Sequence, residues 1–269
     1  MDVKANFSGS MPAHYDRYLG PAWFDALGRD LASRLPARPP GDVLELACGT
    51  GLLTAHLRDR LDPRQKLVAT DISASMVEYA REKLKARKGV EFREADALKL
   101  PFGDGEFGAV VCAFGVMYFP DKEAGLREIR RVLKPRGVLL FNVFDRKEEN
   151  PCSKACGAVF EELFPGDKAA QFDTPYSLAD PDLLRKLTEG AGFDSIAITT
   201  KKVTIGGVKA RDVATGQIRG SPRVTLVEQR GIPADEVIER LTKKLTALGG
   251  ADPFQSHAQC FVVEARATP

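Results

Sequence analysis

The sequence predicts an α/β fold, a seven-stranded and mostly parallel sheet with helices on both faces and an inserted helical cap. Two patterns predict it. From residue 42 to residue 144, short apolar segments rich in β-branched residues alternate with longer segments of helical spacing, which is typical of a parallel sheet. Helical segments that do not belong to this alternation stand at three places along the chain, which predicts additions to the sheet.

The expected elements follow from hydrophobic spacing and from the residues that end each run. A helix is expected over residues 12–35, ended by Pro36. The alternating part predicts strands at 42–47, 66–71, 90–96, 107–115 and 138–144, and helices at 51–61, 73–87 and 124–137. A helix at 180–193 and strands at 195–205 and 259–266 complete the sheet. Ser73 is an expected N-cap, and Pro135 with Gly137 is expected to end the helix before the fifth strand.

The whole chain, residues 1–269, is expected to form a single domain with a cap. Residues 40–145 form its ligand-binding core, and residues 1–38 an N-terminal helical cap element. Helical insertions at 150–176 and 207–248 complete the cap. Parallel sheets bind ligands at the carboxyl ends of their strands, so we expect the cap to cover that edge. For the second insertion, a contact in a homodimer is the alternative.

Composition and charge exclude several classes of protein. The net charge is only +2, and basic and acidic residues are interleaved, without the basic stripe of a nucleic-acid-binding protein. No apolar run is long enough for a membrane span, and the first residues lack the pattern of a signal peptide. We therefore expect a cytoplasmic protein with no nucleic-acid partner. The five cysteines lack zinc-site spacing, so they are expected to be buried and reduced, with no metal site.

The turn between the first strand and the first helix carries the strongest functional signal. It runs from Glu45 to Gly51 as ELACGTG, and its glycines provide room for a ligand to approach the backbone. Asp71 ends the second strand, where a carboxylate can accept both hydroxyls of a ribose. Asp96 ends the third strand, where it can accept from the amino group of an adenine. Each aspartate alone could cap a helix, but together with the turn they indicate a nucleoside-containing cofactor.

The glycine spacing separates two classes of such cofactors. Dinucleotides place a pyrophosphate at the helix N-terminus, which favours a third glycine, whereas Leu52 and Leu53 follow Gly51 here. An NAD(P)-dependent oxidoreductase is therefore disfavoured. S-adenosylmethionine (SAM) has no phosphate and does not need the third glycine.

Four segments resemble the class I SAM-dependent methyltransferases. VLELACGTG is similar to their first motif, DISASMVEYARE to their second, and EADALKLPFGDGEFGAVVCAFGVMYFPD to their third and fourth; LREIRRVLKPRGVLLFNVF resembles the helix and strand that follow. The resemblance covers about residues 40–145 and is nearest to the ubiquinone/menaquinone-type small-molecule methyltransferases. It implies a Rossmann-like fold, a SAM-binding core at 40–145, S-adenosylhomocysteine as the product of SAM, and methyl transfer to a small molecule without a metal.

The resemblance also implies which residues hold SAM. Its implied contacts lie at the strand ends and in the loops after them: Glu45, Ala47, Cys48, Gly49 and Gly51 around the amino-acid end, Asp71 at the ribose, Ile72 and Met76 on the adenine face, Asp96 and Ala97 at the adenine edge, and Ala113 and Phe114 beside the sulfonium. Ala47 departs from the family, which often has glycine at this position, but a methyl group is a small obstacle.

The N-terminal segment HYDRYLGPAWF resembles the leading helix of this group, whose tyrosines can close over the cofactor carboxylate. Tyr15 and Tyr18 are the candidates for this role, with ordinary packing as the alternative. Methyl transfer from a sulfonium depends mainly on alignment and the exclusion of water, so the sequence assigns no catalytic residue. His14, Tyr18 and His257 are the candidates for a general base, should the acceptor require one.

The acceptor is expected to be a small, apolar or aromatic molecule that is methylated at carbon, oxygen or nitrogen. Met117 and Tyr118 follow the fourth strand, and Phe160 and Phe164 lie in the first insertion. These side chains either line the acceptor site or pack in the core. A SAM-fold protein with other chemistry or a regulatory role is the alternative function, because a fold does not determine a reaction.

Overall fold

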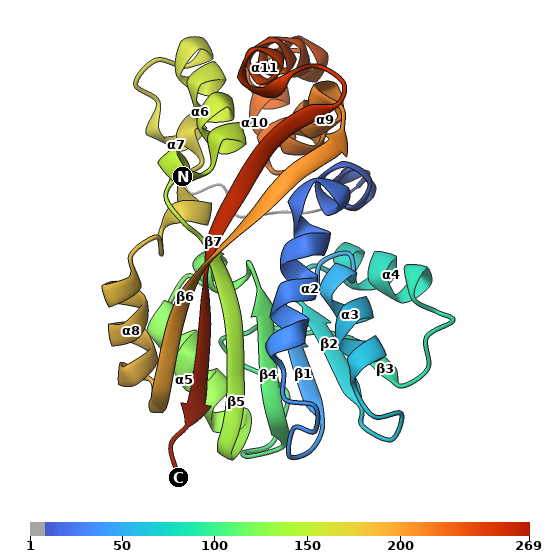
Figure 1. Cartoon of the computed structure of the whole chain (residues 1–269), viewed down its shortest axis with the longest axis vertical. Coiled ribbons are helices and arrows are strands. Elements are labelled where there is room, and N and C mark those ends of the chain that lie inside the picture. The colour runs from blue at the N-terminus through green and yellow to red at the C-terminus, as the bar shows by residue number, and fades with distance from the viewer. Residues whose placement is uncertain (1–8) are drawn as a thin grey trace. The chain divides into compact units, whose positions relative to one another are not determined.

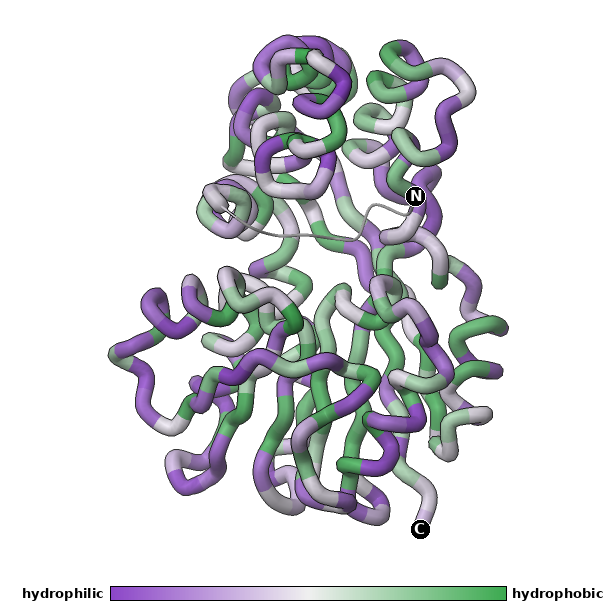
Figure 2. Tube along the Cα trace, turned by 180° about the vertical axis from the view of Figure 1, so that it is seen from behind, coloured by the Kyte–Doolittle hydropathy of each residue, from purple (hydrophilic) through white to green (hydrophobic). Residues whose placement is uncertain are grey.

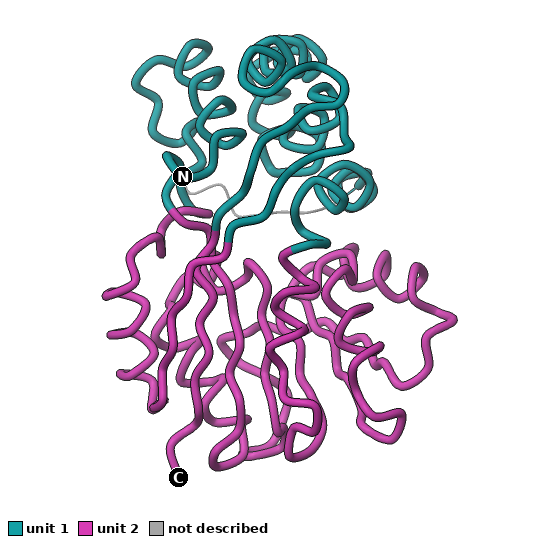
Figure 3. Tube along the Cα trace, in the orientation of Figure 1, with its two compact units in different colours: residues 1–26, 146–174, 202–259 teal, residues 27–145, 175–201, 260–269 magenta. Residues whose placement is uncertain are grey.

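The computed structural model describes residues 9–269, which form two compact units (Figure 3). Unit 1 comprises residues 1–26, 146–174 and 202–259, of which 1–8 are not described. Unit 2 comprises residues 27–145, 175–201 and 260–269. The long strands β6 and β7 contribute residues to both units.

Unit 2 is built on a seven-stranded sheet of order β3-β2-β1-β4-β5-β7-β6 (Figure 1). The strands are β1 (Val43–Leu46), β2 (Leu67–Asp71), β3 (Val90–Glu94), β4 (Phe107–Ala113), β5 (Leu133–Phe144), β6 (Phe193–Val208) and β7 (Phe254–Ala267). Strands β3, β2, β1, β4 and β5 pair in parallel, and β7 pairs with β5 antiparallel. The predicted seven-stranded, mostly parallel sheet is therefore confirmed.

The central strands are almost wholly buried, as their apolar sequences predict. Every residue of β1 is buried, and all but the last residue of β4, whereas the edge strand β3 is largely exposed. Figure 2 shows hydrophobic residues running along these inner strands. The strand order reverses between β1 and β4, and ligands of such sheets bind at the carboxyl ends of the strands at this point.

Helices pack on both faces of this sheet. They are α2 (Asp25–Arg34), α3 (Leu52–Arg60), α4 (Ala74–Lys83), α5 (Lys122–Val132) and α8 (Pro181–Gly190), with short 3₁₀ turns η2 (Val116–Tyr118) and η4 (Thr174–Tyr176). The predicted N-cap of α4 is confirmed, because the Ser73 hydroxyl accepts from the Met76 amide at 3.4 Å. Asp121 and Asp180 cap α5 and α8 in the same way.

The predicted boundary between helix 124–137 and strand 138–144 is wrong. Helix α5 ends at Val132, and β5 begins at Leu133, which pairs with Phe107 before the register shifts. Pro135 lacks an amide hydrogen and does not fit inside a helix, so the chain turns to the sheet before reaching it. Arg136 takes a left-handed backbone conformation, φ 62°, at this irregularity.

Unit 1 brings together the three helical additions. Its elements are α1 (Met11–His14), η1 (Tyr15–Phe24), η3 (Lys147–Glu149), α6 (Pro151–Leu163), α7 (Lys168–Gln171), α9 (Ala210–Arg219), α10 (Arg223–Gln229) and α11 (Ala234–Gly249). Helix α9 packs against η1 and α11, and α6 packs against α11. A Cβ on Gly216 of α9 would lie 2.6 Å from the Leu19 side chain, so glycine is needed for this close approach. That unit 1 covers the sheet stays a prediction.

The predicted N-terminal helix over 12–35 is continuous but not uniform. Within η1 the turns widen, so that the Asp25 amide donates to the carbonyl of Gly20, five residues earlier. Pro21 lies inside this segment, and because proline has no amide hydrogen, a widened turn accommodates it. The predicted cap element began at residue 1, and its residues 1–8 lie outside the described part of the chain.

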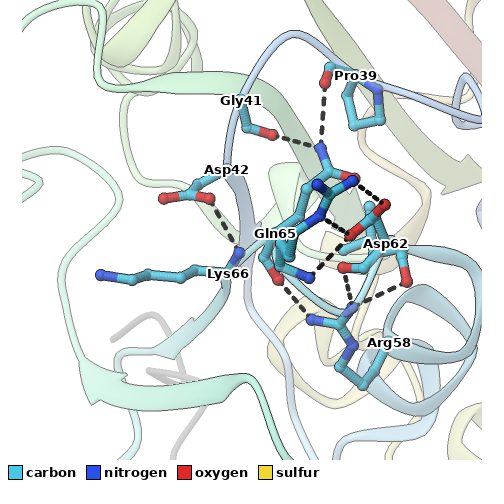
Figure 4. A network of polar contacts seen from close by, with 9 residues as sticks. Pro39, Gly41, Asp42, Arg58, Asp62, Gln65 and Lys66 are labelled. Carbon is cyan, nitrogen blue, oxygen red and sulfur yellow. Dashed lines mark hydrogen bonds and ion pairs between the residues drawn. The ribbon is translucent and has the colours of Figure 1, made fainter.

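Arg58 of α3 joins the loops around the amino ends of the strands (Figure 4). Its guanidinium donates to the carbonyls of Leu61, Asp62, Gln65 and Gly89 at distances of 2.6–3.2 Å. The side chain is only 8% exposed. These hydrogen bonds tie together the loops at this end of the sheet.

Two features bear on the expected environment of the protein. All five cysteines are free and buried, as the sequence predicted. No helix within residues 9–269 is long and apolar enough to cross a membrane.

Candidate cofactor site

The turn after β1 is held open by backbone conformations that favour glycine. Ala47, Gly49 and Gly51 all have positive φ angles, of 52°, 53° and 78°. The Cys48 amide donates to the Thr70 carbonyl of β2 at 2.9 Å, and the Gly51 amide donates to the Cys48 carbonyl at 2.9 Å. The turn is thereby fixed at the carboxyl end of β1, at the switch point of the sheet.

The two glycines of the turn have different surroundings. A Cβ on Gly49 would meet no atom within 4 Å, whereas a Cβ on Gly51 would lie 2.9 Å from the Leu84 side chain and 3.2 Å from that of Ala80. Packing of the start of α3 thus explains Gly51 without a ligand. Gly49 instead borders open space, as expected where a ligand approaches the backbone.

The carboxylate of Asp71 is oriented by two backbone amides. Its Oδ2 accepts from the Gly49 amide and its Oδ1 from the Ser73 amide, both at 2.9 Å. Burial raises the pKa of Asp71, and the surrounding amides oppose this rise. The side chain therefore presents acceptor oxygens in a fixed direction at the end of β2.

Glu45 of β1 is buried and lacks hydrogen-bond partners. It is 1% exposed, and within residues 9–269 neither carboxylate oxygen has a partner of hydrogen-bond geometry. Burial raises its pKa to about 8; the Asp71 charge adds to the rise, while the nearby Thr54 hydroxyl lowers it. An unsatisfied buried acid costs free energy, so this carboxyl group is suited to receive a cationic donor.

The predicted adenine contacts differ in their exposure. Ile72 is 67% exposed, an unusual exposure for a large apolar side chain, whereas Met76 is 3% exposed in the core beneath α4. Asp96 lies two residues beyond the end of β3 at Glu94, not within the strand as predicted. Its Oδ1 accepts from the Leu98 amide at 2.9 Å, and the neighbouring Ala97 is half-buried.

The loop after β4 turns sharply at Phe114, and Asn142 supports it. Phe114 has a positive φ of 53°, and its amide donates to the Asn142 side-chain oxygen at 2.9 Å. Ala113, the last residue of β4, pairs with Asn142 of β5. The Asn142 Nδ2 is buried without a partner among the described residues. Sequence reasoning missed Asn142, although an amide within the apolar strand VLLFNVF was a usable signal.

The predicted acceptor residues of unit 2 follow this loop. Met117 is 1% exposed and packs in the core, whereas Tyr118 is half-buried. Gly115 lies against the turn after β1, because a Cβ on it would be 2.6 Å from the Ala47 Cβ. The loops after β1 and β4 are therefore in direct contact.

The remaining predicted site residues lie in unit 1. His14 and Tyr18 stack with ring centroids 6.1 Å apart, and Tyr15 stacks on Phe24 at 4.8 Å. The ring centroids of the buried Phe160 and of Phe164, both predicted acceptor residues, lie 6.0 Å apart. His257 lies in β7. Its pKa is lowered mainly by burial and to a smaller extent by the nearby charge of Lys202. The structure thus places these candidates in a different unit from the Glu45–Gly51 turn, and their roles stay predictions.

No group of three or more histidine, cysteine or acidic side chains in the described chain is arranged to hold a metal ion.

Comparison with known proteins identifies the family. Residues 43–137 match the family model described as a methyltransferase domain. The chain is 34% identical over 180 residues to a demethylmenaquinone methyltransferase of Deinococcus radiodurans, a match that covers 61% of this chain and 73% of that protein. The chain is a class I SAM-dependent methyltransferase of the ubiquinone/menaquinone type. This confirms the predicted enzyme class and its SAM cofactor.

Further matches agree with membership of this methyltransferase family. The chain is 36% identical over 167 residues to the ubiquinone/menaquinone biosynthesis C-methyltransferase UbiE of Escherichia fergusonii, which covers 57% of this chain and just 66% of that enzyme. A phosphoethanolamine N-methyltransferase 2 of Haemonchus contortus, solved with phosphomonomethylethanolamine and S-adenosylhomocysteine, is similar with a TM-score of 0.60. That match has 16% identity and covers 96% of this chain and 57% of the other, so it shows the fold alone.

The residues of unit 2 fit a SAM molecule in three respects. The Glu45 carboxyl group is buried and unsatisfied, the space beside Gly49 is open, and the Asp71 carboxylate is already oriented. Ile72 follows Asp71 directly, and its apolar side chain is exposed, as expected if a ligand covers it.

Proposed function

We propose that this methyltransferase transfers the methyl group of SAM to a small, apolar or aromatic acceptor, and that the carboxyl ends of β1 to β4 hold the cofactor. One observation carries the cofactor assignment. Two carboxyl groups, Glu45 and Asp71, flank the open backbone of Gly49; one lacks a partner, and the other is fixed by amides. SAM offers each a complement, an ammonium group for Glu45 and two ribose hydroxyls for Asp71.

The other proposed cofactor contacts are those that the family resemblance implies. Ile72 and Met76 lie on the adenine face, and Asp96 with Ala97 at the adenine edge. Ala47, Cys48 and Gly51 complete the turn around the amino-acid end, and Tyr15 and Tyr18 are the residues that the resemblance assigns to the cofactor carboxylate. Ala113 and Phe114 border the sulfonium.

When bound, SAM supplies an electrophilic methyl group, so the protein has little bond chemistry of its own to perform. Its residues hold the acceptor in line with that methyl group and exclude water, and alignment of this kind accounts for large rate enhancements. The tight turn at Phe114, fixed by Asn142, supplies a rigid wall for this purpose. A general base is needed only for an acceptor that must lose a proton, and His14, Tyr18 and His257 remain the candidates.

The relatives support an aromatic acceptor. One relative is named a demethylmenaquinone methyltransferase and the other a ubiquinone/menaquinone biosynthesis C-methyltransferase, which favours an aromatic ring methylated at carbon. Tyr118 of unit 2 is proposed to contact the acceptor, and Phe160 and Phe164 of unit 1 remain candidates for the same role, whereas Met117 packs in the core. We also propose a cytoplasmic location. As an alternative role, residues 207–248 form the contact of a homodimer, which a measurement of the mass in solution tests.

The experiment is an acceptor screen with the full chain and SAM, read by product mass. Hydrophobic phenols and quinols are compared with polar amines of similar size. We expect a gain of one methyl group on the aromatic acceptors, with an equal amount of S-adenosylhomocysteine released. Turnover of the amines alone would refute the aromatic class, and failure to bind S-adenosylhomocysteine would refute the cofactor site.

A further inference from the structure

Arg223, the first residue of α10, is a buried cation without an acid. It is 8% exposed, and its guanidinium makes no ion pair or hydrogen bond with any other residue in the described chain. Burying a charge is costly unless it is paired. The Arg223 charge is therefore not paired with any acid of the described chain.

Two phenylalanines of the first insertion accompany this cation. The guanidinium carbon lies 4.7 Å from the Phe172 ring centre and 5.7 Å from that of Phe160. A guanidinium stacked on rings keeps its N–H groups available in its plane for a further acceptor. Phe172 also adopts a left-handed φ of 49°, which non-glycine residues rarely take. Placing its ring beside Arg223 therefore costs conformational energy of the backbone.

The acid that follows Phe172 in the sequence does not pair with Arg223. Asp173 follows Phe172 directly but forms its ion pair with Lys147. By contrast, Arg230 of the same unit also stacks on a ring, 4.6 Å from the centre of Phe164, yet is paired with Asp167. Arg230 is thus a second arginine of unit 1 that stacks on a ring, but its charge is paired and its side chain is 32% exposed.

A second unsatisfied donor lies close in the chain to Arg223. The Gln217 side chain is 4% exposed, and its Nε2 has no acceptor among the described residues. Ser221 links the two segments, since its hydroxyl donates to the Gln217 carbonyl at 2.6 Å and accepts from the Arg223 amide at 3.4 Å. A guanidinium without an acid and a buried amide without an acceptor, on the neighbouring helices α9 and α10, favour a ligand rich in acceptor atoms.

We propose that Arg223, together with Phe160 and Phe172, binds the carboxylate of an aromatic acceptor. The carboxylate takes two parallel N–H donors of the guanidinium, as in bidentate arginine–carboxylate pairs, and the aromatic ring adds to the apolar surface of the phenylalanines. This rests on the proposed function and narrows it, because an aromatic acid is then preferred over a neutral aromatic molecule of the same shape. Arg223 is thereby a residue that determines specificity.

The test compares two probes of nearly equal shape, 2-naphthoate and its neutral amide 2-naphthamide. Each is titrated calorimetrically into the full chain saturated with S-adenosylhomocysteine. We expect the wild type to bind the naphthoate about tenfold or more tightly than the amide, Arg223→Met to lose this preference, and Arg230→Met to keep it. A wild type that binds neither probe or does not discriminate, or an Arg223→Met protein that still prefers the acid, would overturn the proposal.

The unfolding midpoint of Arg223→Met distinguishes a binding role of Arg223 from a role in holding the fold together. Because removal of an unpaired buried charge relieves its burial cost, the unfolding midpoint of Arg223→Met should be equal to or above that of the wild type. A clearly lower midpoint would mean that the fold itself needs the cation, and the proposal would be wrong. Arg223→Lys keeps the charge but not the planar pair of donors, so it should retain only part of the preference.

The cofactor assignment is tested first in the same series. If the wild type does not bind S-adenosylhomocysteine, the proposed function fails at its cofactor site. If it binds S-adenosylhomocysteine but not the naphthoate preferentially, only the role of Arg223 fails.

Discussion

The backbone amide of Gly49 donates to the carboxylate of Asp71 at 2.9 Å, which joins the turn after β1 to the end of β2. The second oxygen of that carboxylate accepts from the Ser73 amide at the start of α4. Asp71 is thus oriented by the protein before any ligand binds, and pre-orientation of this kind lowers the cost of binding. The assignment of Asp71 to the ribose makes a first prediction.

Asp71→Asn should weaken S-adenosylhomocysteine binding by on the order of 2 kcal/mol, about thirtyfold, because a charged acceptor is replaced by a neutral one. Calorimetric titration measures the loss. Asp42→Asn is the matched control. Asp42 immediately precedes β1, at the amino ends of the strands, and its carboxylate also accepts a backbone amide, that of Lys66 at 2.9 Å. Equal affinity of Asp71→Asn and the wild type would remove Asp71 from the site.

The stability of the free protein should fall with rising pH because of Glu45. Burial raises the pKa of Glu45 to about 8 in the folded protein, above the ordinary 4.5. The folded state therefore holds a proton that the unfolded chain releases, and this contribution is complete below about pH 4.5 and lost as the pH rises to about 8. The unfolding midpoint of Glu45→Gln should decline less between pH 5 and pH 8.5 than that of the wild type. Parallel curves would contradict the buried, protonated Glu45.

Cofactor affinity should show the opposite trend with pH. An ammonium group favours the ionised form of Glu45, so binding of S-adenosylhomocysteine must release the proton that burial retains. Between pH 6 and pH 8 the affinity of the wild type should rise, by at most about tenfold per unit, and level off above the pKa. Glu45→Gln should bind more weakly and with a flatter dependence. An affinity of the wild type that does not rise with pH would place the ammonium elsewhere.

Gly115→Ala should destabilise the protein through the contact between the loops after β1 and β4. The added methyl would lie 2.6 Å from both the Ala47 Cβ and the Cys112 sulfur, and overpacking of this kind costs about 1–3 kcal/mol. Ala47→Gly removes one of these contacts and also relieves a positive φ of 52°, so the double variant should recover part of the loss. Chemical denaturation of the four proteins measures this coupling, and strictly additive effects would contradict the contact.

Arg58→Met should destabilise unit 2 by about 2–4 kcal/mol, since four carbonyls lose a buried donor. The folded variant should still bind S-adenosylhomocysteine normally, because this network lies at the amino ends of the strands. Arg64→Met is the control. Arg64 pairs with Asp62 in the same loop, but its side chain is 90% exposed, so the unfolding midpoint should stay unchanged. A similar loss in both variants would argue against the burial of Arg58 as the cause.

Much of the fold could be predicted because its pattern is local. Parallel strands buried on both faces require continuous apolar segments, and DVLELA and FGAVVCAFG show them directly. Boundaries were less predictable: α5 ends at Val132, earlier than predicted, because Leu133 pairs with Phe107, a residue distant in the sequence. No local signal specifies that pairing.

The cofactor turn could likewise be read from the chain, since glycines and strand-terminal acids are spaced by the geometry of a strand–turn–helix unit. Asn142 was missed because its role depends on the pairing of β5 with β4. Arg223 was missed because its surroundings come from two insertions that are separated in the sequence and meet only in unit 1.

The sequence by itself thus determined the sheet, its connecting helices, the glycine turn and the acids at the strand ends, because hydrophobic period and turn residues act over a few positions. The tertiary structure decided which of these groups are buried, which amides orient Asp71, why the pKa of Glu45 is raised, and that Arg223 lacks an acid. These properties depend on solvent exclusion and on partners brought together by folding, and neither is encoded in the spacing of neighbouring residues.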